Sequence, residues 1–203
     1  MNAAPSRNGP APPAIIRRLW WSERGMIADH LLRLSPHDRY QRFGGHVSDA
    51  TVTAHALRGD AFRRHFLGAF VDGALRGVAE CALLDGLPPR EAELAFSVER
   101  SSQGRGIGTE LFRRMLVFAR NRGVARVFIL TLAGNRRMRH IAAKFHLAME
   151  AQEGELEGRL QLVAPDYLSV LSEAMGEGGA WVQASVGSVR RVWPPSAHGE
   201  RRD

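Results

Sequence analysis

The sequence predicts an α/β (α+β) fold in which one central sheet is flanked by helices. Short apolar runs bounded by turn residues predict strands, and the pair Asp72-Gly73 is a two-residue hairpin signal between two of these runs. Longer segments carry apolar residues at helical spacing before and after the strands. A glycine-rich turn at residues 103–108 joins a strand to the longest of these helical segments.

The composition is that of one domain with two tails. A chain of 203 residues with 44% hydrophobic residues can bury a sizeable core, which we expect at residues 14–175. Residues 1–13 should form a disordered tail and residues 176–203 a flexible one. The single cysteine, Cys81, excludes a disulfide framework and a multi-cysteine zinc site, and we expect no metal. Without a membrane-spanning run or a signal peptide, the expected location is cytoplasmic.

The first third of the chain predicts one strand followed by helices. Residues 14–20 predict a first strand, and residues 26–34 carry apolar side chains at helical spacing. Ser35 followed by Pro36 is typical of a helix start, with serine as the N-cap and proline in the first turn. A further short helix is expected at residues 49–57.

Three antiparallel strands should follow, at residues 65–71, 75–84 and 92–98. The third strand alternates, so that Glu93 shares one face with two small residues, Ala95 and Ser97. A carboxylate beside small side chains leaves room for a ligand. A solvent-exposed face would look similar, although such faces usually favour Thr, Lys or Arg over Ala.

The turn after this strand predicts an anion site. Its residues are Gln103, Gly104, Arg105, Gly106, Ile107 and Gly108. Glycines let the backbone approach a ligand closely, and the first amides of the following helix, near Thr109, have no intrahelical partner. A Rossmann fingerprint would need a further glycine at position 111, where Leu111 stands, and a P-loop would need a lysine that is absent here.

The rest of the domain predicts alternating helices and strands. The expected order is a helix ending at Gly123, a strand at 124–132, a helix at 138–145, a strand at 156–163 and a helix at 166–175. The strand at 124–132 is almost wholly apolar, which predicts burial on both faces.

The net charge of +7 is concentrated around the glycine turn. Residues 104–144 hold ten Arg or Lys and one acid, whereas the rest of the chain is slightly acidic. A local positive field suits a polyphosphate ligand better than a nucleic-acid duplex, whose binders usually spread basic residues along a face. Solvated helix faces would also explain individual arginines.

The pattern Gln-x-x-Gly-x-Gly at 103–108 resembles motif A of the GCN5-related N-acetyltransferase (GNAT) superfamily. The order of elements from about residue 14 to 165 also resembles that fold, a mixed, mostly antiparallel sheet with two splayed strands. Residues 34–43 resemble the Leu-Ser-Pro-x-x-Arg-Tyr-x-Arg-Phe segment of a branch that includes bacterial protein-lysine acetyltransferases.

The resemblance implies acetyl-CoA as cosubstrate. It places the pyrophosphate on the glycine turn, and pantetheine against the backbone near Phe96 and Val98. It also matches Asn135 to an asparagine that often contacts the cofactor. The family's usual tyrosine near the leaving sulfur is replaced by Ala142, so the usual general acid is missing.

The resemblance also supports Glu93 as general base, because several members place a glutamate on this strand. Glu80, on the preceding strand, is the second candidate. A carboxylate of raised pKa can take the proton that an amine must lose before it attacks a thioester. An acyl-cysteine route through Cys81 has no adjacent histidine or acid to support it, which favours a buried apolar role for that thiol.

These observations predict an N-acetyltransferase that moves an acetyl group to an amine of a small molecule or a protein by direct attack. The absent tyrosine leaves a second hypothesis, a non-catalytic acyl-CoA sensor. A nucleic-acid module is disfavoured because the aromatic residues of the basic segment fall at core positions. A homodimer is left open, and no membrane partner is expected.

Overall fold

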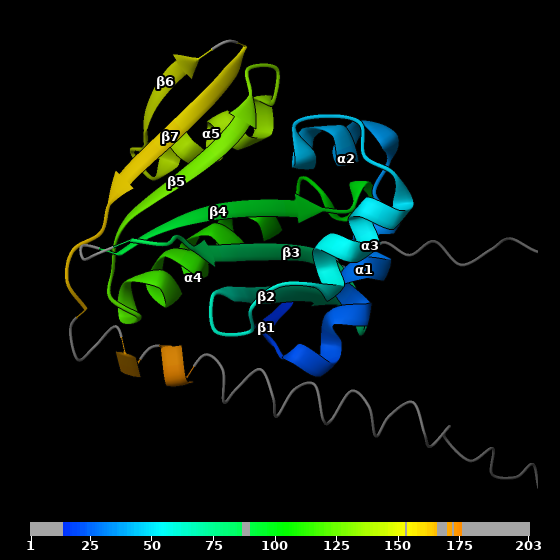
Figure 1. Ribbon diagram of the computed structural model, residues 1–203, viewed down its shortest axis with the longest axis horizontal. Helices are drawn as coiled ribbons and strands as arrows, with labels where there is room; N and C mark the ends of the chain where they lie inside the picture. The colour runs from blue at the N-terminus through cyan, green and yellow to red at the C-terminus, as the bar shows by residue number, and fades with distance from the viewer. Residues whose placement is uncertain (1–13, 87–89, 153, 166–169, 172, 176–203) are drawn as a thin grey trace, which may run out of the picture.

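The computed structural model describes residues 14–86, 90–152, 154–165, 170–171 and 173–175. They form a seven-stranded sheet of order β1-β2-β3-β4-β5-β7-β6 (Figure 1). The strands are β1 (Ile15–Leu19), β2 (Arg64–Val71), β3 (Ala74–Leu83), β4 (Arg90–Val98), β5 (Val124–Leu132), β6 (Ala148–Gln152) and β7 (Glu155–Gln161). All neighbouring pairs are antiparallel except β4 and β5, which are parallel. The predicted fold class, a mixed and mostly antiparallel sheet between helices, is confirmed.

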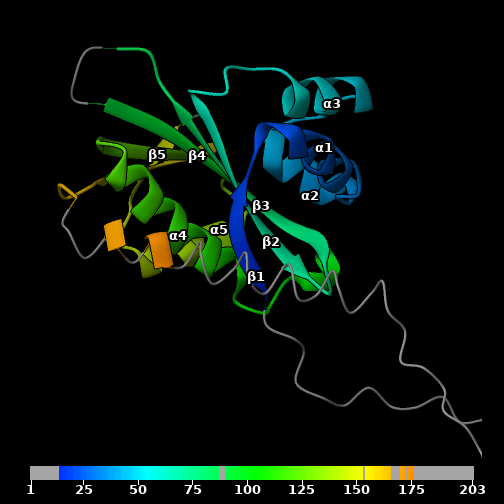
Figure 2. The same cartoon turned by 90° about the horizontal axis from the view of Figure 1, so that it is seen from below.

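Helices cover both faces of this sheet (Figure 2). They are α1 (Arg24–Leu32), α2 (Pro36–Phe43), α3 (Asp49–Leu57), α4 (Ile107–Asn121) and α5 (Arg136–Lys144), with short 3-10 turns at Trp21–Glu23 and Arg100–Ser102.

Side chains that alternate between the two faces of β2 contribute to two hydrophobic cores. Phe66 and Phe70 pack with α1 and α3 on one face, whereas Leu67 and Ala69 pack with α4 on the other.

Several local signals act as the sequence predicts. The Ser35 hydroxyl accepts a hydrogen bond from the Asp38 amide at 3.1 Å, which caps α2. Asp72 and Gly73 both have positive φ, 51° and 72°, as a tight hairpin turn requires. Gly123, at φ 74°, follows the end of α4.

The feature that positions the site is the divergence of β4 from β5. The two strands are in register only from Arg90 to Glu93 on β4 and from Val124 to Phe128 on β5. Beyond Glu93 they separate, while β4 stays paired with β3 as far as Val98 (Figure 1). The β5-facing backbone edge of β4 from Leu94 onward therefore has no partner strand. This is the splay that the resemblance implies.

The structure of the second half differs from the sequence-based expectation in two ways. The strand β6 was not predicted, and it pairs with β7 at the edge of the sheet. Strand β5 is not buried on both faces, because Arg126 and Leu130 are exposed, Leu130 by 53%. The uncovered face lies where the α1 to α3 layer does not extend.

The two tails lie outside the described residues, as does half of the helix expected at 166–175, of which residues 170–171 and 173–175 are helical. Glu173 in this segment accepts hydrogen bonds from Asn121 and Arg122 at 2.6 and 2.8 Å. Among the described residues, no helix combines the length and apolar character needed to cross a bilayer.

Candidate active site

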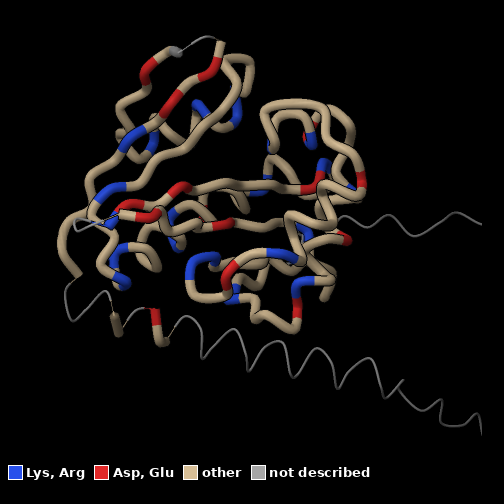
Figure 3. The backbone as a smooth tube through the Cα atoms, viewed as in Figure 1, with Lys and Arg blue, Asp and Glu red and all other residues tan. Residues whose placement is uncertain are grey.

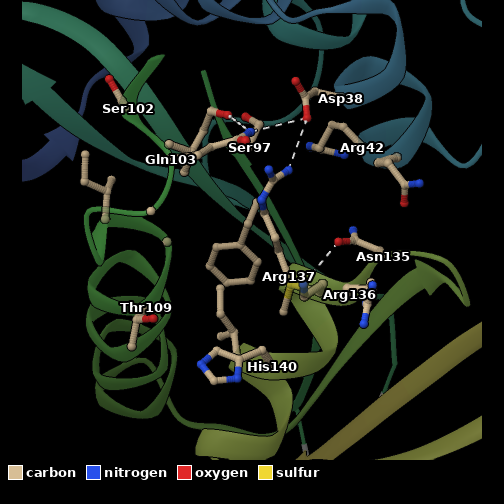
Figure 4. A pocket seen from close by; sticks show the side chains of 18 of the residues that line it. Asp38, Arg42, Ser97, Ser102, Gln103, Thr109, Asn135, Arg136, Arg137 and His140 are labelled. Carbon is tan, nitrogen blue, oxygen red and sulfur yellow. Dashed lines mark hydrogen bonds and ion pairs between the residues drawn. The ribbon is translucent and has the colours of Figure 1, made fainter. Parts of the chain in front are cut away.

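A cavity of about 770 Å³ opens where β4 leaves β5 (Figure 4). Its walls are the end of β4, the glycine turn with the first turn of α4, helix α2, and the turn before α5 together with α5 itself. Nine of the ten residues predicted to bind the cofactor line it: Phe96, Val98, Gln103, Gly104, Gly106, Ile107, Gly108, Thr109 and Asn135. Arg105, the tenth, does not.

The glycine turn and the first turn of α4 give the cavity backbone donors that have no intrahelical acceptor. Gly104 and Gly106 adopt positive φ, 74° and 77°, which glycine reaches without a steric penalty. Gly106 caps α4 without a side-chain acceptor, and the first intrahelical bond runs from the Glu110 amide to the Gly106 carbonyl at 3.0 Å. The preceding amides of the first turn have no intrahelical acceptor, so they and the helix dipole favour an anion here.

Cations predominate among the charged lining residues. Among the described residues, the cavity is lined by one carboxylate, Asp38, and by four cationic side chains, those of Arg42, Arg136, Arg137 and Lys144. Other basic residues recur along α4 and α5 (Figure 3). The charge excess at residues 104–144 is thus placed around the cavity and on the two helices beside it.

Asp38 links the walls of the cavity. Its Oδ1 accepts a hydrogen bond from Gln103 Nε2 at 3.3 Å and lies 4.0 Å from the guanidinium of Arg137 on α5 (Figure 4). The same Gln103 amide donates to the Val98 carbonyl at 2.8 Å. Gln103 therefore fixes the glycine turn against β4. Asn135 acts similarly at α5, where its side chain accepts from the Met138 amide at 3.1 Å.

The comparisons with known proteins agree with this geometry. Residues 28–147, more than half of the chain, match the model of the acetyltransferase (GNAT) family. The chain belongs to the GNAT family.

Individual relatives support the same assignment. A segment of 57 residues is 44% identical to the N-alpha-acetyltransferase RimI of Mycobacterium tuberculosis, covering 28% of this chain and 36% of that protein, so the match spans about a third of the relative's length. The GNAT domain of S. lividans PAT superposes with a TM-score of 0.64 at 20% identity, over 79% of this chain and 100% of that one. The acetyltransferase yncA of Salmonella typhimurium, solved with acetyl-CoA, gives 0.58 at 17% identity, over 77% and 99%.

Family membership confirms the resemblance drawn from the glycine turn. GNAT proteins are acetyltransferases that use acetyl-CoA, so the predicted enzyme class and cosubstrate are those of the family. The structural relatives are too distant in sequence to carry more than the fold.

The GNAT cavity does not include Glu93, the first candidate for the general base. Glu93 is half-buried and sits opposite Ala82 on β3 and Phe128 on β5. It belongs to the paired part of the two strands, before they separate, and it makes no ion pair with the described residues. The alternation of β4 placed it on the expected face, but the point of divergence comes after it.

Glu80, the second candidate, is buried and ion-paired. It contacts Arg42, accepts from His55 Nε2 at 2.9 Å and lies 3.2 Å from Arg64. Burial opposes its ionisation, but His55 and the two arginines overcome this and lower its pKa to about 2. A carboxylate held in this way is a poor base, and Glu80 serves to fix Arg42 at the wall of the cavity.

Two other residues behave as the sequence indicated. Ala142 is buried on α5, so its position supplies no acid. Cys81 is buried, and burial raises the pKa of its thiol to about 12, which fits an apolar packing role.

Ser97 is one of several polar residues in the GNAT cavity that were not identified from the sequence as candidates for chemistry. Ser97 lines the cavity, and its hydroxyl lies 2.9 Å from Nε2 of His30, a fully buried residue of α1. A histidine within the apolar stripe of a predicted helix was the available signal. Its partner on β4 is 67 residues away in the sequence, and only the packing of α1 on the sheet brings the two together.

Proposed function

We propose that the protein transfers an acetyl group from acetyl-CoA to an amine by direct attack of the amine on the thioester. The observation that carries this proposal is the meeting of two features in one cavity. The uncapped start of α4 offers donors for phosphate, and the free edge of β4 offers unpaired backbone groups for an extended amide-containing chain. Such a combination suits a ligand with a polyphosphate at one end and peptide-like bonds along its length.

The residues that would hold the donor follow from this layout. Backbone amides from Gly104 to Thr109 would take the pyrophosphate, with Arg136 and Lys144 adding positive charge. Phe96 and Val98 would present backbone groups to the pantetheine arm. Acetyl-CoA supplies the activated thioester. The protein's part is to orient that thioester at the α2 end of the cavity.

The acceptor would enter beside α2, where Asp38 is the only carboxylate among the described residues that line the cavity. This carboxylate favours a cationic amine over an anionic acceptor. The relative RimI is by its name an N-alpha-acetyltransferase, and residues 34–43 resemble the protein-acetylating branch. Both support an amine on a protein as the first acceptor to examine.

The test is release of CoA thiol from acetyl-CoA in the presence of a panel of amines. The panel should include small amines, lysine peptides and peptides with free N-termini. We expect turnover with at least one class and a raised thermal midpoint with acetyl-CoA alone. Tight acetyl-CoA binding without turnover on any amine would instead favour the acyl-CoA sensor, for which the alanine at position 142 is the supporting feature.

A further inference from the structure

Ser97, His30 and Glu99 form a continuous hydrogen-bonded chain that starts at the cavity wall. Ser97 Oγ lies 2.9 Å from His30 Nε2, and His30 Nδ1 lies 3.2 Å from Glu99 Oε1. His30 lies on α1, Ser97 lies on β4, and Glu99 directly follows β4. The arrangement places a hydroxyl, an imidazole and a carboxylate in series.

The carboxylate fixes the tautomer of the imidazole. Glu99 is ionised, since Arg76 and Arg33 together with His30 lower its pKa to about 2 against the effect of burial. An ionised carboxylate can only accept, so Nδ1 of His30 carries the hydrogen. Nε2 is then an acceptor, and the Ser97 hydroxyl donates to it. His30 is therefore oriented to receive a proton from Ser97.

His30, at the centre of this chain, is closed to solvent, whereas Ser97 at the outer end keeps a small exposed fraction of 8%. His30 is fully buried, and burial together with the charges of Arg33 and Arg42 lowers its pKa, while Glu99 opposes that change. The imidazole is therefore neutral at neutral pH. Ser97 is the member that lines the cavity. Figure 4 draws Ser97 near Asp38 and Arg42 of α2 and apart from Thr109 and His140. The α2 end of the cavity is the end where the proposed thioester would lie.

We propose that Ser97, His30 and Glu99 are a proton relay for acetyl transfer, an inference that rests on the proposed function. As a neutral amine nitrogen bonds to the thioester carbon, the Ser97 oxygen accepts the amine proton and passes its own hydrogen to His30 Nε2. When the carbon–sulfur bond breaks, the imidazolium returns a proton through Ser97 to the sulfur. The products are the amide and the CoA thiol, and the relay ends as it began.

The relay supplies the proton transfers that the other candidate residues do not supply. Ala142 cannot donate a proton to the leaving sulfur. Glu80 is ionised and ion-paired, and Glu93 lies outside the cavity. One relay that takes the proton from nitrogen and gives it to sulfur needs neither a separate acid nor a separate base. In this scheme Ser97 is the catalytic residue, while His30 and Glu99 act through it.

The first test compares Ser97→Ala with Ser97→Thr. With the best amine of the panel, Ser97→Ala should lower kcat by about a hundredfold or more, the usual effect of losing acid–base catalysis. The KM for acetyl-CoA should change by less than about twofold, because the cofactor's phosphate site is untouched. Ser97→Thr keeps the hydroxyl and should recover much of the rate. The matched control is Thr131→Val, which removes a buried β5 hydroxyl that has no hydrogen-bond partner among the described residues and lies outside the cavity.

The second test needs no acceptor. The pKa of the thiol of bound CoA can be followed by the ultraviolet absorbance of the thiolate. When the thiol ionises, the Ser97 hydroxyl can turn from His30 Nε2 to the thiolate, which is a stronger acceptor than a neutral imidazole. Donation to sulfur stabilises the thiolate, so Ser97→Ala should raise this pKa by about 0.5 or more, and Thr131→Val should not.

These outcomes separate the relay from the proposed function. Unchanged kcat in Ser97→Ala overturns the relay, as does an equal loss in Ser97→Thr, which would show that the site needs packing and not a hydroxyl. If the wild-type protein turns over no amine, the proposed function fails. The pKa of the bound thiol then tests the relay. Equal values in the wild type and in Ser97→Ala would overturn it, and a higher value in Ser97→Ala would support it.

Discussion

Gly106 shows how one backbone conformation prepares the cavity. Its φ of 77° turns the chain from β4 into α4 without a side-chain cap, and a Cβ built there meets nothing within 4 Å. Gly106 also lines the cavity. The glycine is therefore needed for its conformation and for the room that it leaves.

Gly106→Val should weaken acetyl-CoA binding by at least about tenfold, or ~1.4 kcal/mol. The branched side chain would project into the open space, and the left-handed conformation would cost about 1–2 kcal/mol of folding stability. Calorimetric titration with acetyl-CoA measures the first effect and thermal unfolding the second.

Gly123→Val is the matched control for that experiment. Gly123 has φ 74° and equally open surroundings, but it lies at the far end of α4. It should lose similar stability and keep its affinity. If the two variants bind acetyl-CoA equally well, the glycine turn is not part of the binding site.

At Glu93 the structure changes the expected result of a substitution. The carboxylate lies in the paired part of β4 and outside the cavity, so Glu93→Gln should alter kcat by less than about tenfold, below the usual effect of losing a general base. Initial rates at neutral pH with saturating acetyl-CoA give the answer. A loss of a hundredfold or more with intact cofactor affinity would restore Glu93 as the base and contradict the relay.

Among the elements, α5 contributes charge to the ligand site. Arg136, Arg137 and Lys144 line the cavity from this one short helix. Opposite them, α2 supplies Asp38 and an arginine that Glu80 already pairs. The positive field is therefore concentrated on the α5 side.

The association rate of acetyl-CoA should fall by about tenfold or more as salt rises, because screening shortens the range of the field from about 30 Å at 0.01 M to about 8 Å at physiological ionic strength. Stopped-flow fluorescence measures this rate. Arg136→Gln should reduce the salt dependence, whereas Arg126→Gln, an exposed residue of β5 that pairs with Glu91, should leave it unchanged. S-acetylpantetheine lacks the phosphates, so a salt effect of the same size with this ligand would refute steering.

Most elements could be predicted because their limits are set locally. The Ser35 cap, the Asp72-Gly73 turn and the Gly123 stop each depend on a few adjacent residues. Strand β6 could not be predicted in the same way. Its sequence, Ala-Met-Glu-Ala-Gln, consists of helix-favouring residues, and it is extended because β7 offers it a backbone ladder. Pairing between strands overrides the local preference there.

The candidate site likewise has a part that is set locally in the sequence and a part that depends on long-range packing. The glycine turn is contiguous in the sequence and could be located from it. The relay joins residues separated by almost 70 positions, and Glu93 was misplaced because the sequence does not mark the residue at which two strands part. Contiguous sites are open to prediction, while sites assembled across layers need the packing.

At the scale of the whole molecule, buried ion pairs tie stability to pH. Glu80 and Glu99 are buried carboxylates whose pKa values are lowered to about 2. An unfolded glutamate titrates near pH 4.5, so each group adds stability above that pH and loses it as the pH falls toward 2. Their contacts join α1, α2, α3 and the sheet, so acid should loosen the α1 to α3 layer.

Glu80→Gln should remove part of this pH dependence. The wild type should lose on the order of 3 kcal/mol per carboxylate between about pH 5 and pH 2, and the variant should show a shallower decline together with a lower stability at pH 7. Urea unfolding followed by circular dichroism at several pH values measures both. Glu93→Gln, which removes a carboxylate that makes no ion pair with the described residues, should follow the wild-type curve. Parallel curves for all three proteins would mean that Glu80 is not preferentially ionised by the fold.

The short pairing of β4 with β5 also has a mechanical consequence. The sheet consists of two parts, strands β1 to β4 and strands β5 to β7, which we call its two leaves. Backbone pairing joins the two leaves only between Arg90 and Glu93 on the β4 side. From Glu93 to Val98, the part of β4 that is paired with β3 but not with β5 is about 16 Å long at the usual rise per residue. A rotation of about 5° at the joint therefore displaces its end by about 1.4 Å. A molecule seated between the leaves holds both and stops that rotation. The donor would then stiffen the whole sheet from its middle, and hydrogen exchange in β5 and β7 would slow although neither strand lines the cavity.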